Sequence, residues 1–266
     1  MVRDGFTGFT QMKIISQNAI MVGLEKVDVE LLNRFPNLKV IGCNCTGTEH
    51  LPLLEMEKRG IKLISLQGER EFLKTITSVS ELTIWFMIEL LRKPHNGRYI
   101  GNQLKDKCVG ILGMGRIGTH VYNRVLPFGV DVLWQDKYEG VGLEKLLKGA
   151  DILTIHIPLN QETGSLLTEN HLKLMKPTAF IINTSRSQVF KEGVIEQTIR
   201  EKWIAGYGTD VVRDDKEMQR LKDLQKEGFN VIITEHVAGN TQEALKATED
   251  FIRKKITNYL HDTITK

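Results

Sequence analysis

The feature that most constrains this chain is the stretch VGILGMGRIG at residues 109–118. An apolar run typical of a buried strand leads directly into Gly113, Gly115 and Gly118, and a helical pattern follows. In such a turn the first glycine permits the tight bend, the second lets the backbone approach a pyrophosphate, and the third lets helix and strand pack closely. The stretch therefore predicts a strand, a turn and a helix whose N–H groups bind phosphate.

A carboxylate follows the next predicted strand. Residues 131–135 predict that strand, and Asp136 comes directly after it, about twenty residues beyond the glycines. A carboxylate at this place accepts hydrogen bonds from the adenosine ribose and repels a 2′-phosphate. A glycine-rich turn alone also closes strands for steric reasons, but the full order of strand, glycines, helix, strand and acid favours dinucleotide binding. The predicted cofactor is NAD rather than NADP.

The rest of the chain alternates short β-branched runs with helical patterns, which predicts an α/β protein. We expect a doubly wound parallel-sheet Rossmann NAD-binding domain over residues 86–241. A smaller, flavodoxin-like α/β substrate domain is expected over residues 1–85 and 242–266. The strands expected in the smaller domain are residues 18–22, 38–42 and 61–65, and helices are expected over 29–34 and 53–59. The strands expected in the larger one are residues 107–112, 131–135, 151–155, 180–183, 204–209 and 230–233.

Two helices and a linker are expected outside these strands. A long helix is expected over residues 71–92, and the polar stretch 93–105, with Pro94, Gly97 and Gly101, is typical of a linker. The helical pattern over residues 241–260 is expected to pack back on the first domain.

Composition excludes several classes of function. The formal net charge is only +3, and cations and anions are interspersed, so no nucleic-acid surface is expected. No apolar run approaches the ~20 residues that span a bilayer, and the first residues lack the apolar core of a signal peptide. Three cysteines in apolar context favour reduced thiols. Cys43 and Cys45 could form a metal or redox pair, but small buried residues are the favoured interpretation, since no further Cys or His stands at ligand spacing. We therefore expect a cytoplasmic protein with no membrane contact and no metal.

Three predicted strand ends carry groups suited to chemistry. Arg186, Asp210 and His236 each follow one of these strands, and the carboxyl ends of parallel strands meet at one edge of a sheet. Arginine can bind a carboxylate in bidentate fashion, and histidine exchanges a proton near neutral pH. Each also has a structural alternative: Arg186 could cap the sheet edge, and His236 could be a satisfied loop histidine.

The chain resembles the D-isomer-specific 2-hydroxyacid dehydrogenases. The resemblance rests on VGILGMGRIG, ADILTIHIPLNQETGSLL, FIINTSRSQVF, GTDVVRDD and TEHVAGNTQEA, and more weakly on PNLKVIGCNCTGTEHL. It implies an NAD-dependent oxidoreductase that transfers a hydride between NAD(H) and a small D-2-hydroxy acid or 2-oxo acid. It also implies a homodimer.

The resemblance further implies roles for individual residues. Arg186 would bind and polarise the 2-oxo acid, His236 would be the acid/base, and Asp215 would support the histidine. The family usually has glutamate at the position of Asp215, and Asp214 or Glu217 could substitute for it. The backbone of Cys45, Thr46 and Gly47 would bind the substrate carboxylate. The implied cofactor-binding residues are Gly113, Gly115, Arg116, Ile117, Gly118, Asp136, His156, Pro158, Thr163, Thr184, Ser185, Asp210 and Gly239.

A second hypothesis belongs to a different class of protein. The same fold could serve as an NAD(H)-binding sensor or scaffold with weak catalysis, since Asp215 replaces a glutamate and Glu235 stands where the family usually has proline. The joint presence of Arg186 and His236 favours the enzyme, because a pure binding module has less need of both.

Overall fold

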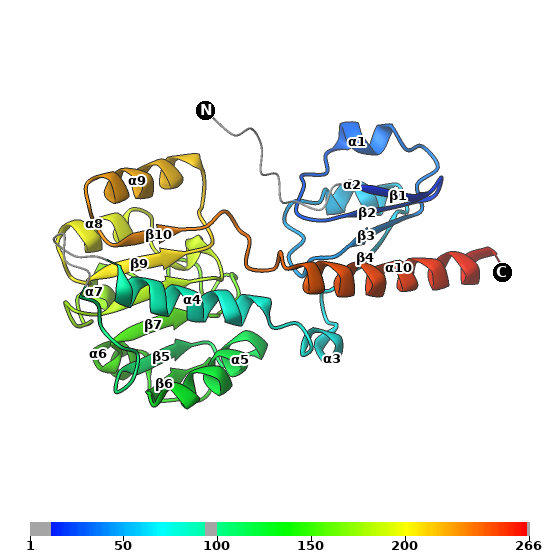
Figure 1. Ribbon diagram of the computed structural model, residues 1–266. Coiled ribbons are helices and arrows are strands. Elements are labelled where there is room, and N and C mark those ends of the chain that lie inside the picture. The colour runs from blue at the N-terminus through cyan, green and yellow to red at the C-terminus, as the bar shows by residue number, and fades with distance from the viewer. Residues whose placement is uncertain (1–11, 94–99, 265–266) are drawn as a thin grey trace. The chain divides into compact units, whose positions relative to one another are not determined.

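The computed structural model describes residues 12–93 and 100–264 and divides the chain into two compact units (Figure 1). One unit comprises Met1–Ile76 with Gly239–Lys266, and the other comprises Thr77–Ala238. Each unit is an α/β layer structure, so the predicted fold class is confirmed.

The sheet of the second unit is wholly parallel and has six strands in the order β6–β5–β7–β8–β9–β10. All six expected strands are present. Because β5 lies between β6 and β7, the order of strands reverses at β5, and in open sheets the ligand crevice lies at such a reversal, outside the carboxyl ends. The strands are β5 (Cys108–Leu112), β6 (Asp131–Gln135), β7 (Ile152–Ile155), β8 (Phe180–Asn183), β9 (Gly206–Thr209) and β10 (Val231–Ile233).

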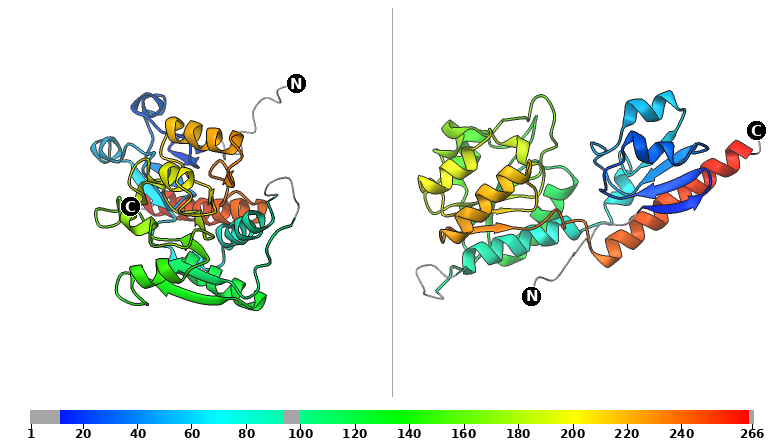
Figure 2. Two further views of the ribbon diagram at one scale, coloured as in Figure 1. Left: turned by 90° about the vertical axis from the view of Figure 1, so that its left-hand side faces the viewer. Right: turned by 90° about the horizontal axis from the view of Figure 1, so that it is seen from above.

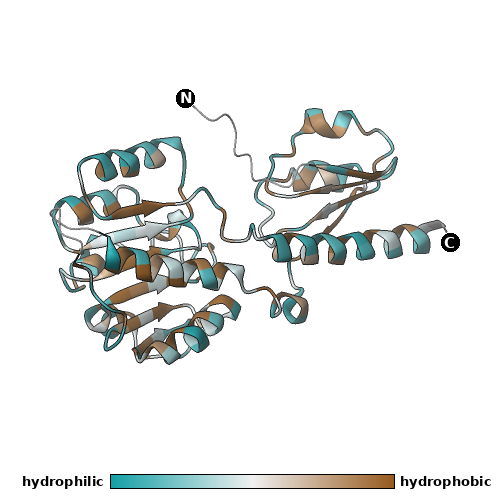
Figure 3. Ribbon diagram, viewed as in Figure 1, coloured by the Kyte–Doolittle hydropathy of each residue, from teal (hydrophilic) through white to brown (hydrophobic). Residues whose placement is uncertain are grey.

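Helices cover both faces of this sheet (Figure 2). Side chains of α4 and α5, such as Phe86 and Val121, are fully buried against one face. Leu146 and Leu224, from α6 and α9, are fully buried on the other. In Figure 3 the apolar strand β10 is brown, whereas β9, of sequence GYGT, is pale. The helices are α4 (Ser78–Arg92), α5 (Arg116–Val125), α6 (Leu143–Gly149), α7 (Glu169–Leu172), α8 (Val194–Arg200) and α9 (Asp215–Lys226), with 3₁₀ turns at Leu126–Phe128 and Ser187–Val189.

The position of α4 explains where the units divide. The sequence suggested boundaries after residue 85 and before residue 242, whereas the structure divides the chain after Ile76 and before Gly239. Helix α4 packs on β8, β9 and β10, so all of it belongs to the second unit. Of the expected linker, Pro94 and Gly97 lie outside the described residues, and Gly101 belongs to the second unit.

The first unit contains a four-stranded sheet in the order β1–β2–β3–β4. Strand β1 (Lys13–Ser16) is antiparallel to β2 (Ala19–Val22), while β3 (Val40–Cys43) and β4 (Lys62–Ser65) continue in parallel. A flavodoxin-like sheet contains a reversal of strand order, whereas the described strands here follow the order of the sequence. On one face lie α1 (Val29–Asn33) and α2 (Leu53–Lys58), whose Leu32 and Met56 are buried.

The closing helix packs on this sheet, as predicted. Helix α10 (Gln242–Ile264) contacts β3 and β4 and buries Ile252 and Ile256 completely. A Cβ at Gly42 of β3 would lie 2.5 Å from Ile256 Cδ1, so the absence of a side chain there lets the helix approach the strand.

The expected helix over residues 71–92 was wrong in its first part. The chain forms α3 (Arg70–Leu73), then a break, and then α4 from Ser78. In the break, Thr75 Oγ1 donates to the carbonyl of Phe72 at 2.7 Å. Such a side-chain bond competes with the helical ladder and favours an end to the helix.

Candidate active site

The glycine turn lies at the reversal of strand order and is held tightly between its neighbours. Gly113 N donates to Gln135 O at 2.8 Å, and His156 N donates to Leu112 O at 2.7 Å. Gly113 has a φ of 101°, and a Cβ there would lie 2.7 Å from the carbonyl carbon of His156. A Cβ at Gly118 would lie 2.0 Å from Gly113 O. These two glycines are therefore required by packing alone.

Gly115 differs, because nothing lies within 4 Å of the place a Cβ would take. It is the N-cap of α5, and no side chain caps that helix or places an acid in its first turn. The packing of the protein thus leaves Gly115 open to the exterior. A bare backbone at a helix N-terminus is the arrangement that receives a pyrophosphate, so the turn fits the predicted dinucleotide.

The acid after β6 is fixed to this turn. Asp136 Oδ2 accepts from Met114 N at 3.0 Å, and Oδ1 accepts from Lys137 N at 2.7 Å. Asp136 N in turn donates to Glu139 O at 2.8 Å. The glycine turn and the acid therefore lie side by side, as binding of the pyrophosphate and the ribose of one ligand requires.

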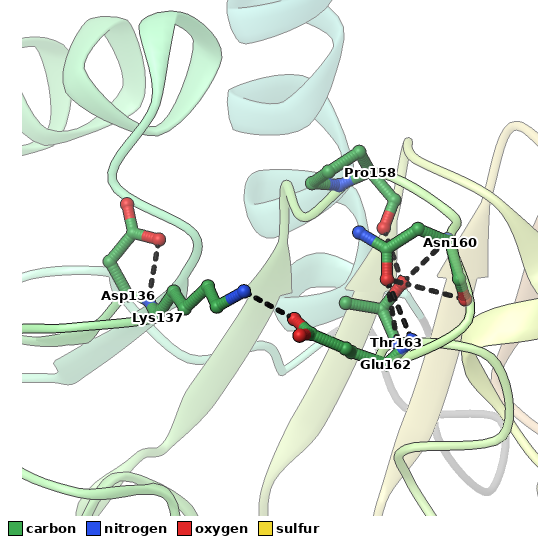
Figure 4. Close-up of polar contacts among 6 residues, drawn as sticks. All are labelled: Asp136, Lys137, Pro158, Asn160, Glu162 and Thr163. Atoms are coloured by element: carbon green, nitrogen blue, oxygen red, sulfur yellow. Dashed lines mark hydrogen bonds and ion pairs between the residues drawn. The ribbon is translucent and has the colours of Figure 1, made fainter.

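The loop after β7 supplies two more of the expected residues, Pro158 and Thr163 (Figure 4). Thr163 Oγ1 donates to Pro158 O at 2.6 Å, and Asn160 N donates to Thr163 Oγ1 at 2.9 Å. Asn160 Oδ1 accepts from the backbone of Glu162 and Thr163. The role of Asn160 in closing this loop was not predicted, although Asn is common in turns because its side chain can accept from the backbone N–H two residues on, as it does from Glu162.

His156 is held in a neutral form next to this loop. Its Nε2 lies 2.9 Å from Thr154 Oγ1, and its Nδ1 lies 3.5 Å from Thr184 Oγ1. Removal of the ring from water lowers the pKa of His156 to about 3, although the residue as a whole is only partly buried. A neutral imidazole is a hydrogen-bonding group rather than a proton source at physiological pH.

The turn that carries Arg186 is organised by Asn183, the buried last residue of β8. Asn183 Oδ1 accepts from both N and Oγ of Ser185 at 2.9 Å, and its Nδ2 donates to Arg186 O at 3.0 Å. Arg186 Nη1 donates to Ser185 O at 2.8 Å. Next along the chain, Ser187 Oγ donates to the carboxylate of Glu217 at 2.6–2.7 Å. The role of Asn183 was not predicted, and Glu217, expected as a possible partner of His236, instead accepts from Ser187.

Asp210 holds the segment that carries His236. Its carboxylate is buried, and Oδ1 accepts from Thr234 Oγ1 at 2.5 Å and from Val237 N at 2.8 Å, while Oδ2 accepts from Ala238 N at 2.9 Å. His236 N donates to Asp210 O at 2.9 Å, and His236 has a φ of 56°. The structure therefore brings Asp210 and His236 together, with the histidine exposed at the tip of a fixed turn.

The three acids after Asp210 have different places. Asp214 caps α9 by accepting from Glu217 N at 2.8 Å, and Glu217 accepts from Ser187 and from Arg213 N. Asp215 is the first residue of α9 and is exposed, and its side chain forms no hydrogen bond or ion pair with any other described residue. Its predicted support of His236 stays a prediction.

In the first unit, the expected residues Cys45, Thr46 and Gly47 follow β3. Cys45 O accepts from Leu66 N at 3.1 Å, and Thr46 and Gly47 line a pocket of about 630 Å³. Just before them, Cys43 Sγ lies 3.8 Å from His50 Nε2. Hydrogen bonds with Cys45 and His50 lower the pKa of Cys43 to about 5. The hydrogen bond between Cys43 and His50 also raises the pKa of His50. This pair was not predicted.

Three expected residues remain to be placed. Arg116 and Ile117 are the first two residues of α5, directly after Gly115, and Gly239 begins the closing segment of the first unit. Thr184 is buried at the end of β8, and its Oγ1 lies 3.4 Å from Thr83 Oγ1 of α4.

Within residues 12–93 and 100–264, no helix is both long and apolar enough to cross a membrane.

Comparison with known proteins identifies the larger unit. Residues 73–238 match the family model described as "D-isomer specific 2-hydroxyacid dehydrogenase, NAD binding domain". The glyoxylate reductase of Thermofilum pendens is 32% identical over 248 residues, which are 83% of this chain and 71% of that protein. The glyoxylate reductase of Thermococcus litoralis is 29% identical over 266 aligned residues, which are 87% of this chain and 77% of that protein.

A solved structure shares the fold. The D-lactate dehydrogenase of Aquifex aeolicus, crystallised with NAD and lactic acid, superimposes with a TM-score of 0.73 at 24% identity. The alignment covers 93% of this chain and 84% of that one.

Proposed function

Because this chain belongs to the D-isomer specific 2-hydroxyacid dehydrogenase family and is an NAD-dependent dehydrogenase, we propose which of its residues carry out hydride transfer between NAD(H) and a small 2-hydroxy or 2-oxo acid. The observation that carries the proposal is the row of groups at the carboxyl edge of one sheet. The glycine turn, Arg186 and the turn of His236 follow β5, β8 and β10.

The glycine turn and Asp136 bind the cofactor. The open Gly115 admits the pyrophosphate to the N-terminus of α5, and Asp136 accepts hydrogen bonds from the ribose hydroxyls. Pro158, Thr163, Thr184 and neutral His156 line the same crevice. NADH, when bound, supplies the hydride.

Arg186 and His236 act on the substrate. The Arg186 guanidinium binds the 2-oxo acid and stabilises negative charge that develops on its carbonyl oxygen. His236 donates a proton to that oxygen, and it removes the proton in the opposite direction. Asp210 holds the histidine turn in place, and Asp215 is the proposed acid that supports the imidazolium. The backbone N–H groups near Cys45, Thr46 and Gly47 are proposed to bind the substrate carboxylate.

The names of the relatives suggest the substrates to test. Glyoxylate is the first choice, and pyruvate, hydroxypyruvate and phosphohydroxypyruvate extend the panel to neighbouring enzymes of the family. The sensor hypothesis is not favoured, because the relatives are named as reductases and dehydrogenases. A homodimer and a cytoplasmic location stay predictions, and light scattering would test the first of them.

The decisive experiment follows the loss of NADH absorbance with each 2-oxo acid in the wild type, His236→Ala and Arg186→Ala. We expect turnover in the wild type, a loss of turnover with NADH affinity retained in His236→Ala, and a strongly raised KM for the acid in Arg186→Ala. NADH binding without turnover on any acid would contradict the proposed substrate class. An equal loss of NADH affinity and turnover in His236→Ala would contradict the role given to the histidine.

A further inference from the structure

An ion pair joins the two loops that flank the glycine turn (Figure 4). Lys137 Nζ lies 2.6 Å from Glu162 Oε2. Lys137 follows Asp136 at the end of β6, and Glu162 lies in the loop after β7. Because β5 lies between these strands, the pair spans the carboxyl end of β5, where the glycine turn begins.

Both partners extend from anchored backbone. Asn160 Oδ1 accepts from Glu162 N at 2.9 Å, and Lys137 N donates to Asp136 Oδ1 at 2.7 Å. Figure 4 shows the Lys137 side chain extended away from Asp136 and toward Glu162. The Glu162 carboxylate also raises the pKa of Lys137. The lysine is thus directed toward a partner whose backbone is held by Asn160.

The position of Lys137 matters because of what distinguishes the two nicotinamide dinucleotides. NADP carries a phosphate on the ribose hydroxyl that Asp136 would bind, and a neighbouring cation is the usual means of accommodating that phosphate. Lys137 is the residue directly after the acid, and an ammonium is a good partner for phosphate. With Glu162 as its partner, this cation is neutralised and directed to the other loop.

We propose that Glu162 is a second determinant of specificity for NAD over NADP, since it withholds Lys137 from a 2′-phosphate. The inference rests on the proposed cofactor site. Discrimination then has two parts: Asp136 repels the phosphate, and Glu162 removes the cation that would compensate. Both side chains of the pair are more than half exposed, at 52% and 65%. The expected effect is therefore that of a surface ion pair, about three- to fivefold in affinity for NADPH.

The test measures dissociation constants for NADPH and NADH by energy transfer from tryptophan to the reduced nicotinamide. The variants are Glu162→Gln, Lys137→Ala and the double variant. Glu227→Gln is the matched control, because it removes the same charge from an ion pair with Arg200 at the far end of α9. Binding is read directly, so the result does not depend on turnover.

We expect Glu162→Gln to bind NADPH about three- to fivefold more tightly than the wild type, with NADH affinity changed less than about twofold. The gain should vanish in the double variant, should be absent in Glu227→Gln, and should shrink at high salt. An unchanged ratio of NADPH to NADH affinity in Glu162→Gln would overturn the proposal, as would a gain that persists without Lys137. Saturable NADH binding without turnover would count against the proposed reaction and leave this test intact, whereas no NADH binding would overturn the cofactor site on which both rest.

Discussion

Replacement of Asp210 by Asn should release the turn that carries His236. The carboxylate accepts three hydrogen bonds, from Thr234 Oγ1, Val237 N and Ala238 N. An amide offers one acceptor oxygen and one NH₂ group, so at least one of these donors must face another donor. The change removes little volume, and its effect comes from the lost acceptor and the lost charge.

The size of the effect follows from these bonds. A hydrogen bond to a charged group contributes about 1.5–3 kcal/mol and one to a neutral group about 0.5–1.5 kcal/mol, while a buried donor left unsatisfied costs about 1–3 kcal/mol. One lost bond and two weakened bonds give a loss of about 2–4 kcal/mol in the free energy of unfolding. His236 has left-handed backbone, which costs about 1–2 kcal/mol and persists only while the turn is held. Its relaxation should misplace the imidazole and lower kcat at least about tenfold.

Tryptophan fluorescence during urea unfolding measures the stability of the relevant unit. The three tryptophans, Trp85, Trp134 and Trp203, all lie in the second unit. Thr234→Val is the matched control, because it removes one of the three bonds with little change of shape and should cost about 1–2 kcal/mol. An Asp210→Asn protein within 0.5 kcal/mol of the wild type, or one with unchanged kcat, would refute the reasoning.

Three further predictions concern the same unit. Gly115→Ala should keep the wild-type melting temperature and weaken NADH binding at least about tenfold, because its Cβ meets only the ligand, whereas Gly118→Ala should unfold more easily; equal melting losses in both variants would show that Gly115 is structural. Glu217→Gln should raise the KM for the 2-oxo acid more than that for NADH, since it weakens the bond that fixes Ser187 beside Arg186; a change in NADH affinity alone would argue against this. The depressed pKa of His156 means that the unfolded state binds more protons than the folded state between about pH 3 and 6.5, so the free energy of unfolding should fall as the pH falls from 6.5. His156→Asn should lessen this decline by about 1–2 kcal/mol at pH 5. If the free energy of unfolding, measured with urea, falls equally in the wild type and the variant between pH 7 and 5, the assignment is contradicted.

The strands of the second unit were predictable because each one carries its own signal. Residues 152–155 and 180–183 are short β-branched runs that the sheet buries on both faces, and periodicity identifies such runs locally. Strand β1 carried no such signal, since its residues are largely exposed and its structure depends on pairing with β2. The break at Thr75 was missed for a related reason: it contains neither Gly nor Pro.

The site was predictable only in part, because many of its supporting contacts join residues that are distant in sequence. The glycine turn and Asp136 follow a known spacing, and the structure ties them together through Met114. The bonds of Ser187 to Glu217 and of Lys137 to Glu162 cross 30 and 25 positions of the chain. No periodicity or local propensity encodes such pairs, so they appear only once the strands are placed side by side.

The acids that follow Asp210 show how the start of a helix can resolve what the sequence leaves open. Asp214, Asp215 and Glu217 were all candidates to support His236. An N-cap side chain turns back to the N–H groups of the first turn, and Asp214 does so, which commits it to the helix. Glu217, in that first turn, turns to Ser187 and so supports the arginine rather than the histidine. The Asp215 side chain neither caps the helix nor contacts Ser187. It is therefore the acid whose replacement by Asn should alter the pH dependence of kcat without loss of stability.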